Sequence, residues 1–402
     1  MSSQEIKQGL LGLAQSIPTL SAHEHHKEDV FFAKLDLDNL IEASYAGWCG
    51  VHPNHDVELR NKFFEEVRFN SYWRWLWEGI KAAHGMEGEF RTEQWEDLSA
   101  RIFAAHKADP QLHINLLKRA GYERLIQDAY WNPGDDMGHP DIFATTFRID
   151  SFLYGFHEDA KGPVDFKVWE HYNIKPKSLA EYVEWIKTEI RRRREAGAVA
   201  LKSAEAYNRP LDYEKADKKA AERVWGKPQE KAKTEEKLAF GRYIFNVCVE
   251  AAQEFDIPFQ VHLGLGQLTD VNPMTFLPTI QHYPSVRFVL FHYGYPWIHE
   301  IHGIIHNYKN AYPDFTWLPL IAPRAAKEAL SECIEVVQNI KTIGWGSDCW
   351  TAEESTGAIM AWRDVVVDVL AEKVADGYIN LADAEKLVAM LMRENWKYIY
   401  GR

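Results

Sequence analysis

The sequence predicts an α/β fold, a (β/α)8 barrel that carries a helical insertion after its first strand. Two observations lead to this prediction. Eight short apolar runs typical of strands alternate with longer segments of helical periodicity. Several of these runs end in a histidine, a lysine or an aspartate, and active-site residues of such barrels lie at the carboxyl ends of the strands. We expect one domain over residues 1–402.

The first strand is expected to follow a helix at residues 4–16, where Ile6 and Leu10 have helical spacing. Its apolar run, from Ile17, ends in His23-Glu-His25. Alternate residues of a strand point to the same face, so the two histidines can face one ion. Imidazole is the commonest metal ligand, but a zinc site needs three or four protein ligands. The pair alone fits a solvated loop cluster equally well, and further ligands must come from later strands.

Residues from about 28 to 120 form a helical, aromatic insertion between the first and second strands. Connections in α/β units usually take about 2–6 residues plus a helix, and this segment is far longer. Trp73 and Trp77 share one helical face, where they would pack the insertion onto the barrel. The alternative is a substrate-facing lid with Arg74 as its polar contact. Because loops leaving the carboxyl ends of strands emerge on the catalytic face, we expect the insertion to border that face.

Polar residues end most of the later strands. These strands are expected at Tyr122–Asp128, Ile142–Arg148, Ala198–Ser203, Ile257–His262, Arg287–His292, Asp314–Leu318 and Thr342–Asp348. Lys202 ends the fourth strand, His262 the fifth, His292 the sixth and Asp348 the eighth. A single histidine in such a place is more often a hydrogen-bonded core residue. Several together indicate a metal site, because a metal site requires convergence and a barrel core does not.

Composition limits the partners and the location. The chain has 59 Asp and Glu residues against 46 Lys and Arg, a formal net charge of −13, so we expect no nucleic-acid or membrane partner. The 4 cysteines form no CxxC pair, which argues against a disulfide framework and a thiolate zinc site. The sequence has no apolar run of about 18 residues and no secretion signal. We expect a cytoplasmic homo-oligomer that acts on a small molecule.

Four strand-end motifs carry a family resemblance. They are His23-Glu-His25, Val261-His262-Leu-Gly, Phe291-His292-Tyr-Gly-Tyr-Pro-Trp297 and Gly346-Ser-Asp348. As a set they resemble the amidohydrolase superfamily, specifically its branch related to aminocarboxymuconate-semialdehyde decarboxylase and uronate isomerase. The segment from Arg393 to Gly401 also looks like the closing helix of that branch. The resemblance covers most of the chain outside the insertion and implies a metal-dependent enzyme.

The resemblance also implies roles for the strand-end residues. The residues expected to hold or adjoin a divalent metal, most simply zinc but also manganese or iron, are His23, His25, His262 and Asp348. Zinc with three protein ligands lowers the pKa of bound water to about 7. Asp348 would take the proton from that water, while His292 would act as acid or base or bind a second metal. Lys202 would hold a substrate carboxylate or, if carboxylated, bridge two metal ions.

The expected function is hydrolysis of a C–N or C–O bond, in an amide, lactone or ester, of a small anionic substrate. A non-oxidative decarboxylase or a sugar-acid isomerase could use the same site. A non-enzymatic sensor or scaffold fits least, because such domains tend to lose complete ligand sets. The cationic and hydroxyl groups expected to contact the substrate are Arg148, Lys202, Tyr207, Arg209 and Arg74, through charge-assisted hydrogen bonds. The alternative for those at the strand ends is ion pairing within the barrel rim.

Overall fold

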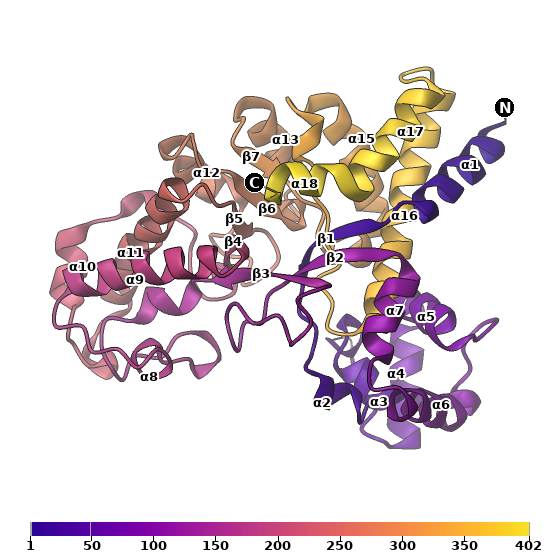
Figure 1. The fold of residues 1–402 in the computed structure, drawn as a ribbon, viewed down its shortest axis with the longest axis horizontal. Coiled ribbons are helices and arrows are strands. Elements are labelled where there is room, and N and C mark those ends of the chain that lie inside the picture. Colours follow the sequence, from indigo (N-terminus) through magenta and orange to yellow (C-terminus); the bar gives the residue numbers. More distant parts are fainter. Residues whose placement is uncertain (1, 49, 402) are drawn as a thin grey trace.

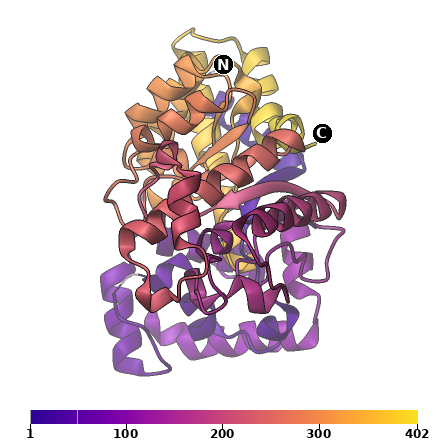
Figure 2. The same cartoon turned by 90° about the vertical axis from the view of Figure 1, so that its left-hand side faces the viewer.

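The computed structural model of the chain describes residues 2–48 and 50–401. Within these residues seven strands form one parallel sheet, in which each strand pairs with its neighbours in sequence. They are β1 (Thr19–Glu24), β2 (Tyr122–Gln127), β3 (Phe143–Arg148), β4 (Ala198–Ser203), β5 (Phe259–His262), β6 (Phe288–Phe291) and β7 (Ala311–Pro313). Parallel strands need long crossover connections, and helices supply them around the outside of the sheet (Figure 1 and Figure 2).

Residues 343–349 close this sheet into a barrel, although they do not form the regular strand expected at 342–348. On the β7 side, the amide of Phe315 donates to the carbonyl of Gly344 at 2.9 Å. On the β1 side, the amide of Ala22 donates to the carbonyl of Trp345 at 2.9 Å. The segment therefore occupies the place of an eighth strand, and the predicted (β/α)8 barrel is confirmed.

The seventh strand lies earlier in the chain than the expected Asp314–Leu318. β7 ends at Pro313, and the short helix α14 (Leu318–Ile321) already begins at the last residue of the expected range. The Asp314 carboxylate accepts a hydrogen bond from the amide of Thr316 at 2.8 Å, a local turn that interrupts the regular strand. The apolar residues that predicted the strand belong to the main hydrophobic core, in which Phe315 and Leu318 are fully buried.

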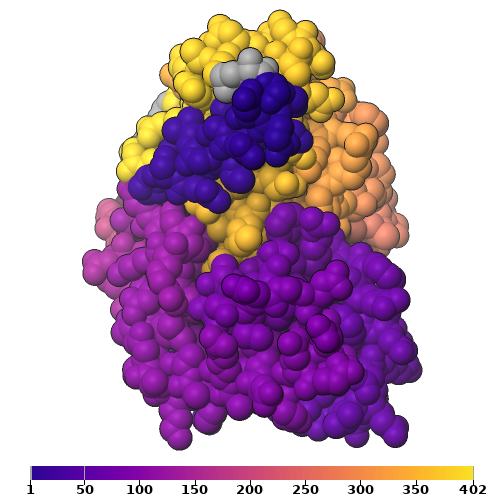
Figure 3. Space-filling model, turned by 90° about the vertical axis from the view of Figure 1, so that its right-hand side faces the viewer, coloured from indigo at the N-terminus to yellow at the C-terminus, as the bar shows by residue number. Residues whose placement is uncertain are grey.

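Helices outside the connection between β1 and β2 surround the barrel. They are α1 (Ser3–Ser16), α8 (Val168–His171), α9 (Leu179–Glu195), α10 (Lys218–Val224), α11 (Thr234–Glu254), α12 (Pro273–His282), α13 (Ile298–Asn307), α15 (Pro323–Val336), α16 (Ala352–Ala375), α17 (Leu381–Ala389) and α18 (Asn395–Tyr400). Short 3-10 turns follow several strands, among them η3 (Asp150–Tyr154), η5 (Glu205–Tyr207) and η8 (His292–Gly294). Figure 3 shows α1 lying against the C-terminal helices. Among the helices described, none is long and apolar enough to cross a lipid bilayer.

The chain between β1 and β2, called the β1–β2 segment below, is almost entirely helical. Its elements are α2 (Asp29–Phe32), α3 (Leu37–Glu42), η1 (Tyr45–Trp48), α4 (Val57–Val67), α5 (Ser71–His84), η2 (Thr92–Gln94), α6 (Trp95–Ala108) and α7 (Leu112–Ala120). Trp73 and Trp77 pack with Phe63, Phe90 and Trp95 in a hydrophobic cluster whose buried members all lie between residues 32 and 102. The expectation that these tryptophans attach the segment to the barrel is therefore wrong, because they form the segment's own core.

The attachment is made instead by α5 and α16, which pack with their backbones in contact. A Cβ atom on Gly79 of α5 would lie 2.0 Å from the carbonyl oxygen of Glu353, and one on Gly357 of α16 would lie 2.0 Å from that of Trp75. Neither position can hold a larger residue without separating the helices. The two glycines therefore fix the β1–β2 segment against the helix that begins just after Asp348.

Candidate functional site

His23, His25 and Asp348 meet at the carboxyl end of the barrel. The Nε2 atom of His25 lies 3.2 Å from Oδ1 of Asp348, and the Nε2 atom of His23 lies 3.5 Å from the same oxygen. All three side chains are buried, and their nearest nitrogen and oxygen atoms lie within 4.8 Å of one another. Ligand atoms about 2.0–2.1 Å from a tetrahedral zinc ion are about 3.3 Å apart. The observed spacing therefore fits three ligands around one ion.

The tautomer of His25 supports this fit. Its Nδ1 lies 2.8 Å from the carbonyl of Asp128, to which it donates, so Nε2 of a neutral imidazole has a lone pair directed at the Asp348 carboxylate. Two acceptors facing each other at this distance repel unless a cation or a proton lies between them. Burial, with the charge of Lys202 acting in the same direction, lowers the pKa of His23 well below its ordinary value. His23 is thus held in the neutral form that binds metals.

Glu24, the residue between the two histidines, positions the backbone that carries Asp348. Its carboxylate accepts hydrogen bonds from the amides of Ser347 and Cys349 at 3.3 and 3.2 Å. Asp348 itself has a φ of +66°, in the left-handed region that costs energy for a residue with a Cβ atom. The first-strand motif therefore contains two candidate ligands and also contacts the backbone on both sides of the third.

Arg148 and Lys202 place positive charge beside these three residues. The Nε atom of Arg148 donates to Oδ2 of Asp128 at 3.0 Å, and the same oxygen lies 3.5 Å from Nε2 of His23. Burial lowers the pKa of Lys202 to about 7, while Asp348 acts in the opposite direction. The Nζ atom of Lys202 lies 3.6 Å from the ring centroid of Phe291. Asp128 was not expected as a site residue, although its place at the end of the second expected strand was a usable signal.

His262 and His292 form a neighbouring pair, separate from the cluster of three. Nδ1 of His262 lies 2.8 Å from Nε2 of His292, whose Nδ1 donates to the carbonyl of Thr316 at 2.9 Å. The other nitrogen of His262 contacts the carbonyl of Leu265. Burial lowers the pKa of His292 to about 4, although Asp348 opposes this effect. His262 thus lies at the expected mouth, with its ring nitrogens directed away from the cluster.

These groups surround a cavity of about 350 Å³. Besides His23, His25, Asp348, Arg148, Lys202 and His262, its lining includes Tyr45, Trp48, Tyr130, Asp150, Pro163, Val164, Ala204, Tyr207, Asn208 and Trp350. Five of the lining side chains are aromatic rings, and that of Tyr207 lies 4.6 Å from the ring of His262. Tyr45 and Trp48 come from η1 of the β1–β2 segment, which therefore borders the catalytic face as expected. Aromatic residues of the insertion were predicted to border the substrate from the stretch between Tyr72 and Trp77, but none of that stretch lines the cavity.

Comparison with known proteins assigns the family. A family model described as amidohydrolase matches residues 180–400, more than half of the chain. The chain belongs to the amidohydrolase family. The curated protein fluG of Emericella nidulans is 29% identical over 149 residues, which are 36% of this chain and 17% of fluG. The match of this amidohydrolase therefore covers less than a fifth of the length of that relative.

Solved structures show the same fold over nearly the whole chain. A uronate isomerase from Thermotoga maritima has a TM-score of 0.75 at 15% identity, covering 98% of this chain and 97% of that one. A glucuronate isomerase from Caulobacter crescentus has a TM-score of 0.73 at 18% identity, covering 99% of this chain and 94% of that one. A metal-dependent hydrolase candidate from Lactobacillus casei has a TM-score of 0.71 at 17% identity, covering 98% of this chain and 97% of that one. At such identities the likeness shows the fold alone.

Two expected substrate contacts of this amidohydrolase lie outside the cavity lining. Arg209 is buried, and its Nη2 donates to the carbonyl of Leu238 at 2.5 Å. Its guanidinium group occupies the space beside Gly241 of α11, where a Cβ atom would lie 1.6 Å from Nη1. Arg74 is exposed, with its guanidinium carbon 5.4 Å from the ring of Trp75. The expectation that these arginines reach the substrate cavity does not fit their positions.

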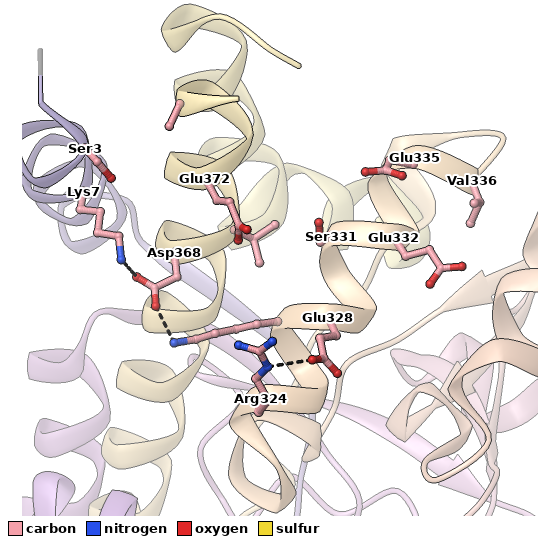
Figure 4. Close-up of a pocket in the computed structure, with 13 residues that line it drawn as sticks. Ser3, Lys7, Arg324, Glu328, Ser331, Glu332, Glu335, Val336, Asp368 and Glu372 are labelled. Carbon is pink, nitrogen blue, oxygen red and sulfur yellow. Dashed lines mark hydrogen bonds and ion pairs between the residues drawn. The ribbon is translucent and has the colours of Figure 1, made fainter. Parts of the chain in front are cut away.

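A hollow of about 940 Å³ lies on another face, between α1, α15 and α16 (Figure 4). Its charged side chains pair with one another: Nζ of Lys7 lies 2.7 Å from Oδ1 of Asp368, and Nε of Arg324 lies 2.7 Å from Oε1 of Glu328. Among the described residues, those lining it include no histidine and no cysteine. The smaller strand-end cavity is therefore the candidate site.

Proposed function

We propose that this amidohydrolase is a metal-dependent hydrolase that cleaves a C–N or C–O bond, in an amide, lactone or ester, of a small anionic substrate. One observation carries the proposal: two histidines and Asp348 converge at a strand-end cavity that also contains Arg148 and Lys202. A metal-ligand set and a pair of cations on one wall suit the activation of water beside a bound anion.

The metal would be held by His23, His25 and Asp348. Zinc suits two imidazoles and a carboxylate best, while manganese or iron are alternatives, and His262 stays a predicted fourth ligand at the same mouth. When bound, such an ion acts as a Lewis acid that polarises a carbonyl and makes water more acidic. With unmodified Lys202, we propose a single ion at this centre.

Asp348 and His292 would move the protons. Burial acts to raise the pKa of Asp348, but nearby positive charge, including that of Lys202, holds it below its ordinary value. Asp348 is therefore ionised at neutral pH and can accept a proton from the attacking water. His292 lies behind His262, so proton exchange between His292 and the substrate would pass through the contact of 2.8 Å between the two rings.

Arg148 and Lys202 would bind the anionic group of the substrate, and the aromatic wall would enclose its apolar part. A guanidinium group can hold a carboxylate in a bidentate manner. Asp128 fixes the Nε edge of Arg148, and Nη1 lies 3.8 Å from Oδ2 of Asp150. Tyr207, whose ring packs on His262, is proposed to border the bound substrate.

A second candidate is the isomerisation of a sugar acid. The observation in its favour is that the two isomerases named above match this chain from end to end, including the length taken by the β1–β2 segment. The carboxylate of a sugar acid would use the same two cations. A decarboxylase would also use them, but no further observation favours it. A cytoplasmic location and homo-oligomerisation stay predictions.

The test is turnover by the full chain loaded with zinc, manganese or iron in turn. The substrate panel contains lactones, esters and amides that carry a carboxylate, together with uronic acids and aromatic acids. We expect hydrolysis of at least one member, lost in Asp348→Asn and retained in His299→Asn, a variant at an exposed histidine. Isomerisation of a uronic acid with no hydrolysis across the panel would reject the proposal in favour of the second candidate.

A further inference from the structure

A second buried group of metal-binding side chains lies outside the lining of the strand-end cavity. It joins His84 at the end of α5, His106 near the end of α6 and Glu353 in the first turn of α16. Nε2 of His84 lies 2.9 Å from Oε1 of Glu353, and Nε2 of His106 lies 2.8 Å from the same oxygen. The three residues are 7%, 2% and 0% exposed. The group therefore connects two helices of the β1–β2 segment to a helix of the barrel.

Hydrogen bonds from the two imidazoles satisfy only half of the Glu353 carboxylate. Both histidines approach Oε1, whereas Oε2 is buried and has no hydrogen-bond partner among the described residues. Burial acts to raise the pKa of Glu353, but His106 and His84 hold it well below its ordinary value, so the group is ionised. The ion pairs of Glu353 in the described part of the chain are with these two histidines. The buried Oε2 atom is therefore the part of this group that a bound cation would satisfy.

We propose that His84, His106 and Glu353 form a second metal site, which binds a divalent transition-metal ion, zinc before others, as a structural cross-link. Two imidazoles and one carboxylate are ligands that zinc takes in proteins. The ligand atoms would have to move apart by only about 0.4–0.5 Å to reach the spacing around a tetrahedral ion. The free Oε2 atom would then become a second carboxylate donor in place of an unsatisfied acceptor.

The position of the site explains what the cross-link would do. The carbonyl of Glu353 contacts Gly79 of α5, at the place where α5 and α16 pack backbone against backbone. From α6, His106 reaches Glu353 through its Nε2 atom. A bound ion would hold all three helices at one point. It would take no part in the reaction, because none of its ligands lines the strand-end cavity.

The substitution Glu353→Gln separates a metal site from a hydrogen-bonded contact. The amide oxygen of glutamine can still accept from both imidazoles, so a contact that is only hydrogen-bonded would keep the fold and the metal content unchanged. The amide has no charge and is a poor zinc ligand, so a metal site would lose its ion. The matched control is His299→Asn, because His299 is itself exposed and belongs to a different group, with His302 and Glu332.

The full-length proteins are loaded with zinc, dialysed against buffer free of zinc, and measured for zinc per chain. We expect about two ions in the wild type and in His299→Asn, and about one in Glu353→Gln. Anomalous diffraction at the zinc edge should place one ion between His84, His106 and Glu353. Equal zinc content in the wild type and Glu353→Gln, or no anomalous peak at this position in wild-type crystals, would overturn the proposal. His23→Ala, which removes the other ion, keeps the two proposed sites distinguishable.

Discussion

Glu24, the last residue of β1 and the neighbour of His23 and His25, accepts hydrogen bonds from the backbone amides on both sides of Asp348. This relationship makes Glu24 a positioning residue for the proposed metal ligands. In Glu24→Gln one carboxylate oxygen becomes an NH2 group, which cannot accept from the Ser347 or Cys349 amide. Loss of such an outer contact typically weakens metal affinity by about 10–100-fold. We therefore expect weaker zinc binding in a competition titration with a chromophoric chelator.

The control for Glu24→Gln is Glu205→Gln, a substitution at another buried glutamate, which accepts from Tyr154 and does not touch residues 347–349. It should leave zinc affinity within about twofold of the wild type. The absorption spectrum of the cobalt-loaded protein is the second readout, because it reports ligand geometry and does not respond to a general loss of stability. Unchanged zinc affinity and an unchanged cobalt spectrum in Glu24→Gln would remove the positioning role.

Lys202 distinguishes one metal ion from two at the strand ends. If Lys202 is not carboxylated and binds the substrate carboxylate, Lys202→Met should keep the wild-type metal content. Loss of a charge-assisted hydrogen bond, about 1.5–3 kcal/mol, should raise KM by about 10–100-fold. Metal analysis and steady-state kinetics on the same preparation test both parts. If Lys202→Met instead loses metal, the lysine is a carboxylated bridge between two ions.

Trp48 is the exposed end of the aromatic wall, and Arg74 is its natural comparison within the β1–β2 segment. The Trp48 side chain lines the cavity and is 57% exposed, so Trp48→Ala should raise KM several-fold with little change in Tm. Arg74→Ala should change neither quantity, because Arg74 is exposed and lies outside the lining. Equal kinetic effects of the two substitutions would show that the wall does not contact the substrate.

The convergence of His23, His25 and Asp348 could be predicted because its causes are local. Alternation along a strand places the two histidines on one face, and barrel topology brings strand ends together. Arg209 could not be placed in this way. It follows a 3-10 turn after β4, and its direction depends on the space that Gly241 leaves on α11, far away in sequence.

The aromatic side chains that line the cavity could not be predicted from local sequence either. Tyr45 and Trp48 lie in a 3-10 turn with no hydrophobic periodicity, so nothing in their sequence directs them to the cavity. Trp73 and Trp77 do have helical periodicity, and they are buried. Periodicity predicts that one face of a helix is buried, but not which residues it packs against. Trp73 and Trp77 pack against other residues of the β1–β2 segment.

A test of that core uses pH. Asp38 of α3 accepts from Nη2 of Arg60 at 2.8 Å and from the indole of Trp95 at 3.0 Å. Burial acts to raise the pKa of Asp38, but these hydrogen bonds hold it below its ordinary value of 3.8. A lowered folded-state pKa stabilises the protein above the unfolded-state pKa, and that stability is lost as the pH falls through the folded-state pKa.

Asp38→Asn should therefore lower the free energy of unfolding at pH 7 by about 1–3 kcal/mol. The difference from the wild type should shrink as the pH falls below about 4. Urea midpoints of both proteins, measured at pH 7 and at several acidic values, give the comparison. A difference that stays constant down to the acid transition would show that the Asp38 carboxylate is not the stabilising group.

The central claim is that His23, His25 and Asp348 bind a catalytic metal ion, and metal content measured together with turnover tests it most directly. His23→Ala and Asp348→Ala should each contain about one zinc ion fewer per chain than the wild type and show no detectable turnover. Arg74→Ala, an exposed site on α5, should keep both. Purified, folded His23→Ala and Asp348→Ala proteins with the full metal content of the wild type would contradict the claim.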